Sequence, residues 1–125
     1  MTMSDGLLST AAVLLVVTAF VHSVLGEWRL IGPLLARREG VLANDLARVV
    51  LRLAWHGLSV TWMVLALILV RLVRDPATVR LWAAAGTGAA FSGVGLFDAV
   101  ASRGRHVGWP MLTAIGIAAL LSLRY

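Results

Sequence analysis

Residues 6–28 read GLLSTAAVLLVVTAFVHSVLGEW, and this stretch decides the fold class. Residues 6–26 contain no Asp, Glu, Lys or Arg. A helix needs roughly 20 apolar residues to cross a bilayer core about 30 Å thick, and this segment has that length. Backbone groups without partners are too costly in hydrocarbon, so the segment is expected to be a membrane-spanning helix.

The composition supports a membrane protein. The chain has 125 residues, of which 60% are hydrophobic and 14% are charged. Soluble domains are closer to half apolar and about a quarter charged. The length predicts a single domain, residues 1–125, and the absence of cysteine excludes disulfides and thiolate metal ligands. The net charge of +5 does not indicate nucleic-acid binding, because the arginines stand at the ends of apolar runs.

Three further apolar stretches, residues 48–70, 79–101 and 107–123, complete the predicted fold. We therefore expect an all-α integral membrane protein, a bundle of four transmembrane helices. Residues 33–39 are interpreted as a short interfacial helix, opened by Pro33 and stopped at Gly40. In the third helix, Ala84, Gly88 and Ser92 follow one another at intervals of four, which predicts close helix packing inside the bundle.

Four spans place both termini on one face of the bundle, with the 71–78 turn. The opposite face, here called the loop face, carries the 27–47 and 102–106 connections. It holds seven arginines against four on the terminal face. The positive-inside rule then puts the loop face in the cytoplasm and both termini on the non-cytoplasmic side.

Most of the ionisable residues that lie near helix ends are also on the loop face. Helix spacing places Glu27, Arg52 and Asp98 in an outer layer, with His22 and His56 deeper. Because ionisable side chains in a bilayer normally pair inside the bundle, we predict a structural ion pair of Arg52 with Asp98 or, alternatively, with Glu27. Ser23 and Glu27, four residues apart, should share one helix face.

Three motifs carry a resemblance to a family. These are HSVLGE at residues 22–27, AWHGLS at 54–59 and GRHVGWPML at 104–112. Together they resemble a pattern found in small four-helix bacterial membrane proteins. The resemblance implies a four-helix protein of the bacterial inner membrane, and it implies no activity for any residue.

Two functions remain open from the sequence. The first is a small accessory or structural subunit whose polar cluster fixes helix packing or binds a partner, such as a larger membrane complex, or a lipid headgroup. Its headgroup contacts would be Arg37, Arg38, Arg103 and Arg105.

The alternative is a metal- or haem-dependent membrane protein, with zinc, iron, copper or haem as the cofactor. Its ligands would come from His22, His56, His106, Glu27 and Asp98, and haem would lie between His22 and His56. No H-E-x-x-H, G-x-S-x-G or phosphate-binding glycine motif is present, so the sequence leaves open whether the protein is an enzyme.

Overall fold

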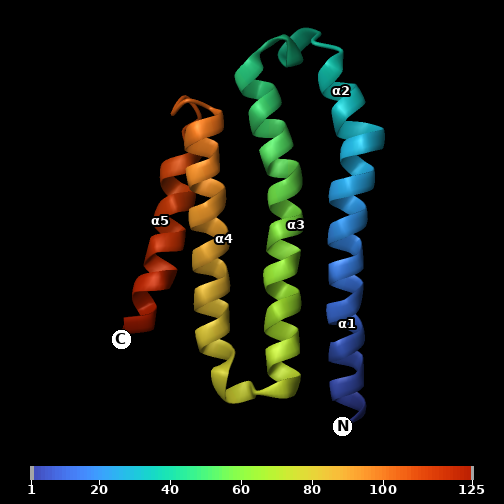
Figure 1. Cartoon of the computed structure of the whole chain (residues 1–125), viewed down its shortest axis with the longest axis vertical. Helices are drawn as coiled ribbons and strands as arrows, with labels where there is room; N and C mark the ends of the chain where they lie inside the picture. Colours follow the sequence, from blue (N-terminus) through green and yellow to red (C-terminus); the bar gives the residue numbers. More distant parts are fainter. Residues whose placement is uncertain (1, 125) are drawn as a thin grey trace.

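The computed structural model describes residues 2–124, and the predicted all-α class is confirmed. Figure 1 shows long helices running side by side. The elements are α1 (Met3–Phe20), α2 (Gly32–Ala36), α3 (Asp45–Arg74), α4 (Val79–Ala101) and α5 (Gly108–Leu121). Short 3₁₀ turns at Gly40–Ala43, Pro76–Thr78 and Ser122–Arg124 complete the chain.

The first helix is longer than predicted. Two π-helical turns, Val21–Leu25 and Glu27–Ile31, join α1 to α2, so the helix runs on from Met3 to Ala36. The predicted end at residue 26 and the separate interfacial helix over residues 33–39 are therefore wrong. The wide turns explain why Pro33 does not end the helix, because its ring would clash with the carbonyl group four residues back in a regular α-helix.

Helix α3 also exceeds its predicted range of 48–70. The side chain of Asn44 accepts a hydrogen bond from the amide of Leu46 at 2.8 Å and caps the helix start. Before α3 the chain reverses direction at Arg38 and Gly40, whose φ angles are 52° and 55°. Arg38 occupies the left-handed region that glycine normally fills, so the reversal holds an arginine in an uncommon conformation.

Helices α4 and α5 match their predicted ranges closely and pack through small residues. A Cβ atom on Gly116 would overlap the backbone nitrogen of Ser92 and lie 2.9 Å from the carbonyl oxygen of Gly88. A Cβ atom on Gly95 would lie 2.7 Å from the amide nitrogen of Thr113. Two members of the predicted small-residue row thus pack against α5 within this chain, as expected.

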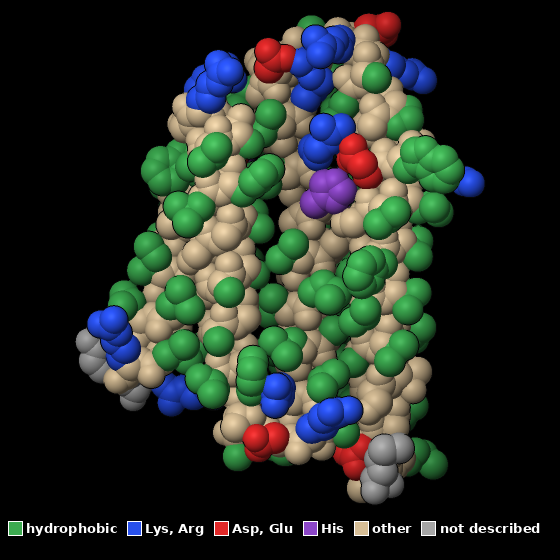
Figure 2. Space-filling view, in the orientation of Figure 1, with side chains coloured by type: hydrophobic (Ala, Val, Ile, Leu, Met, Phe, Trp, Pro, Cys, Tyr) green, Lys and Arg blue, Asp and Glu red, His purple; other side chains and the backbone are tan. Residues whose placement is uncertain are grey.

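The helices form two antiparallel pairs, α1 with α3 and α4 with α5, and the short turn between α3 and α4 joins them. Both termini lie at the same end as this turn, and the loop face is at the other end (Figure 1). Figure 2 shows charged side chains at the two ends and hydrophobic ones between them. Met3–Ala36, Asp45–Arg74 and Pro76–Ala101 are long and apolar enough to cross a membrane, and Gly108–Arg124 is a shorter apolar helix.

The α4–α5 contact leads to a stability prediction. Gly116→Ala should lower the free energy of unfolding by about 1–3 kcal/mol, because the new methyl group overpacks the contact with Ser92. Gly93→Ala is the matched control, since nothing lies within 4 Å of a Cβ atom there. It should leave stability unchanged or raise it by about 0.5–1 kcal/mol. Thermal unfolding in detergent compares them, and equal melting temperatures would contradict the close packing.

Candidate functional site

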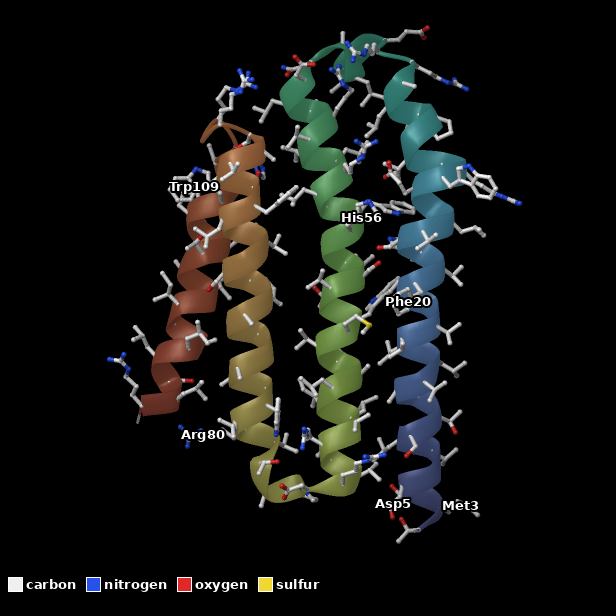
Figure 3. All side chains as sticks on the ribbon, viewed as in Figure 1. Met3, Asp5, Phe20, His56, Arg80 and Trp109 are labelled. Atoms are coloured by element: carbon white, nitrogen blue, oxygen red, sulfur yellow. The ribbon has the colours of Figure 1, made fainter. Side chains whose placement is uncertain are left out.

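A hydrogen-bonded chain of four side chains links α1 to α3 near the loop face. The Arg52 guanidinium lies 2.7 Å from Oε1 of Glu27 through Nη2, and its Nε donates to Oε2 at 3.3 Å. His56 Nε2 lies 3.2 Å from the same Oε2, and His56 Nδ1 lies 3.0 Å from Oγ of Ser23. We call Ser23, Glu27, Arg52 and His56 the α1–α3 cluster; Figure 3 shows His56 reaching from α3 toward α1.

Ser23 and Glu27 both contact a single histidine, His56, from within the π-helical turns. Both residues lie within these turns, where the backbone is wound more widely than in an α-helix. Hydroxyl groups in helices often donate back to a carbonyl four residues earlier, as Thr10 and Thr61 do here. The Ser23 hydroxyl instead lies against His56. The predicted shared face of Ser23 and Glu27 is confirmed.

The partners of His56 determine its tautomer. A carboxylate paired with arginine only accepts hydrogen bonds, so His56 Nε2 carries the proton and donates it to Glu27. In the neutral ring, Nδ1 is then the unprotonated nitrogen, and it accepts a hydrogen bond from the Ser23 hydroxyl. The arrangement gives His56 a basic nitrogen directed at a hydroxyl group, with a carboxylate orienting the ring from the other side.

A second contact between α1 and α3 lies beside the cluster. The rings of His22 and Trp55 stack with centroids 4.0 Å apart. His22 Nε2 donates to the Trp55 carbonyl at 3.2 Å, and Trp55 Nε1 donates to the His22 carbonyl at 3.0 Å. Gly26 makes room for this indole, since a Cβ atom there would lie 2.6 Å from Trp55 Cζ2. These contacts fix the two helices at the depth of the cluster.

Asp98 forms a separate pair, at the junction of α4 with its loop. It is fully buried, and His106 Nδ1 donates to its Oδ2 at 2.5 Å. The predicted ion pair of Arg52 with Asp98 is wrong, and the alternative pairing with Glu27 is correct. Asp98 lies on α4, which packs against α5. Arg52 lies on α3, and its side chain pairs with Glu27 in the turns that follow α1.

Between α3 and α4 a cleft of about 900 Å³ opens toward the loop face. Its outer part carries five arginines and one carboxylate, and Leu53, Val60 and Phe97 are among its apolar residues. We call it the arginine cleft. The arginines are Arg38, Arg48, Arg52, Arg103 and Arg105.

These arginines differ in how they are held. Arg48 pairs with Asp45 and donates to the Leu42 carbonyl. Within residues 2–124, no carboxylate pairs with Arg38 or Arg103. Both residues have positive φ angles, 52° and 54°. Of the predicted headgroup contacts, Arg38, Arg103 and Arg105 line the cleft, and Arg37 does not.

The five residues predicted as metal ligands fall into three groups. Glu27 lies with His56, Asp98 lies with His106, and His22 lies with the tryptophans. Over residues 2–124, no group of three or more His, Asp or Glu side chains could hold a metal ion. The predicted placement of haem between His22 and His56 also meets an obstacle, because both ring nitrogens of His56 are already hydrogen-bonded.

Comparison with known proteins adds no relative. No protein family, curated protein or solved structure matches the chain. The site is therefore interpreted from its own geometry. Sequence reasoning missed the cleft-lining role of Arg48 and the interhelical role of Trp55. The glycine at position 26 was the available signal for a bulky partner such as Trp55.

The Glu27–Arg52 pair should couple energetically. Glu27→Gln and Arg52→Gln should be non-additive in the free energy of unfolding, with an interaction energy of roughly 0.5–3 kcal/mol. Chemical unfolding of both single variants and the double variant in detergent measures this energy. Asp75→Asn combined with Arg52→Gln is the control, and it should be additive because Asp75 lies at the opposite end of α3. Additivity in both cycles would contradict the pairing.

Proposed function

We propose that the protein spans the membrane and binds an anionic amphiphile, such as a phosphate-bearing lipid, in the arginine cleft. One observation carries the proposal: the cleft combines five arginines at its loop-face end with an apolar lining deeper between α3 and α4. The arginines suit an acidic headgroup, and the apolar lining suits the hydrocarbon chain attached to it. The α1–α3 cluster has a structural part in this function, because it holds one wall of the cleft in place.

The exposed surface supports membrane insertion. Large apolar side chains cover the outside of α1, with Leu7, Val13 and Phe20 each more than half exposed. Monomeric soluble proteins rarely expose apolar patches larger than a few hundred Å². We further propose the bacterial inner membrane as the location, on the sequence resemblance, with both termini on the non-cytoplasmic side.

The headgroup chemistry follows from the free arginines. A guanidinium donates two parallel hydrogen bonds to a phosphate, which favours arginine for such recognition. Arg38 and Arg103 meet no carboxylate in the described chain, so their donors are available. Uncommon backbone conformations are found where the surrounding structure requires a particular side-chain position. The positive φ angles of both residues fit a role in binding.

The other functions expected from the sequence have less support. A role as accessory subunit of a larger complex is compatible with lipid binding, and the lipid would then be part of the interface. The metal- or haem-dependent alternative gains no support from the geometry, since the predicted ligands lie in separate groups.

Lipid binding can be tested by native mass spectrometry of the protein released from neutral detergent. Added phosphatidylglycerol should bind in preference to phosphatidylcholine. Arg38→Gln with Arg103→Gln should weaken this binding about 30-fold, from roughly 1 kcal/mol for each arginine at an anionic surface. The matched control is Arg74→Gln with Arg124→Gln, at the opposite end of the molecule. Equal loss in both double variants would contradict binding in the cleft.

The proposed orientation predicts the behaviour of C-terminal fusions. Alkaline phosphatase fused after the last residue should be active, and green fluorescent protein at the same position should be dark in cells. Both outcomes follow from placing the arginine-rich loop face in the cytoplasm. A fluorescent fusion with inactive phosphatase would reverse the orientation.

A further inference from the structure

We propose that Ser23 is a nucleophile, activated by His56 and Glu27, that accepts an acyl group from an ester-bearing anionic amphiphile held in the arginine cleft. The substrate class rests on the proposed function. The reactivity of Ser23 does not, because it depends on the α1–α3 cluster alone.

The distances meet the requirement for an activated hydroxyl group. A nucleophile and its base lie within about 2.6–3.2 Å of each other, and a third group orients the base. Ser23 Oγ is 3.0 Å from His56 Nδ1, and His56 Nε2 is 3.2 Å from Glu27 Oε2. Serine, histidine and carboxylate therefore follow one another in a hydrogen-bonded line. The same roles occur on unrelated folds and are recognised by geometry rather than by position in the sequence.

Charge around the histidine favours proton transfer from Ser23. The Glu27 carboxylate accepts from Arg52 and from His56 Nε2, so it lies against the ring nitrogen that does not face Ser23. When Nδ1 takes the serine proton, the ring becomes an imidazolium ion. The Glu27 carboxylate stabilises that cation directly, as the acidic member of a catalytic triad does.

The cleft reaches the histidine of this site, and Ser23 lies beyond that ring, outside the residues that line the cleft. His56 lines the cleft with Arg52 and Arg48, and its side chain is 35% exposed. At 1.5 Å per residue, His56 lies about 6 Å below Arg52 and about 12 Å below Arg48 along α3. In a glycerolipid the ester carbonyl groups lie between the phosphate and the hydrocarbon chains. A phosphate bound among the arginines would therefore bring an ester toward the depth of His56.

The reaction is an acyl transfer that balances without a cofactor. Ser23 Oγ attacks the ester carbonyl carbon while its proton passes to His56 Nδ1. The bond from the carbonyl carbon to the alcohol oxygen breaks, and the leaving alcohol takes the proton from His56. The products of this step are the free alcohol and an acyl ester of Ser23. Water, deprotonated by His56, then attacks the acyl carbon; the bond from that carbon to Ser23 Oγ breaks, Oγ takes the proton back from His56, and a carboxylic acid is released.

The test is covalent labelling of the whole protein in neutral detergent by an alkyl phosphonofluoridate without charge. Ser23 Oγ should displace fluoride, and mass spectrometry of the digested protein should find the phosphonyl group on Ser23. His56→Gln should slow labelling by at least 100-fold, since general base catalysis typically contributes 10²- to 10⁴-fold. Ser59→Ala, which removes a different hydroxyl, three residues after His56 on α3, should label at the wild-type rate.

The outcomes separate this proposal from lipid binding. The double variant with Arg38→Gln and Arg103→Gln should bind phosphatidylglycerol more weakly. It should keep the labelling of Ser23, because the probe carries no charge. Folded wild-type protein, judged by its helical circular dichroism, that leaves Ser23 unlabelled overturns the nucleophile, even if lipid still binds. Labelling that persists undiminished in His56→Gln also overturns it. Wild-type protein that is labelled at Ser23 by the probe but, in a separate assay without the probe, releases no fatty acid from phosphatidylglycerol overturns the substrate assignment.

Discussion

The carboxylate of Glu27 accepts from both Arg52 and His56, and the arrangement of α1 against α3 depends on this shared acceptor. The partners lie 25 and 29 residues away along the chain. Part-buried charged groups are costly unless they pair, so separating the two helices would leave Glu27 and Arg52 without partners. The stacked rings of His22 and Trp55 add a packing contact between the same two segments. The α1–α3 cluster therefore holds the two helices together and is also the candidate reactive site.

The two helix pairs are held together by different means, and the cleft lies between them. Helix α4 packs on α5 through glycines, which bring the backbones close. The π-helical turns that follow α1 meet α3 through polar and aromatic side chains instead. The α3–α4 turn joins the pairs at the end opposite to the loop face. At the loop face the space between α3 and α4 is lined by arginines, whose like charges do not favour closure without an anion.

Much of the fold could be predicted from hydropathy, because apolar length alone marks each helix. The range 79–101 was predicted correctly, and the loop face was recognised because four successive antiparallel helices return both termini to one end. The continuation of the first helix was missed, because proline and glycine usually end a helix and the π-helical turns have no clear signal in the sequence. The partner of Arg52 depended on helix packing, and spacing along the chain could not choose between Glu27 and Asp98.

The nitrogen-15 spectrum of the His56 ring tests the central claim most directly. Protein labelled at histidine and held in detergent gives separate signals for the two ring nitrogens, and His56→Gln identifies them by their loss. For the neutral ring, the geometry predicts the proton on Nε2, bonded to Glu27, and an unprotonated Nδ1 that accepts from Ser23. In Ser23→Ala the Nδ1 signal should shift while Nε2 keeps its proton. A neutral ring protonated on Nδ1 would contradict the account.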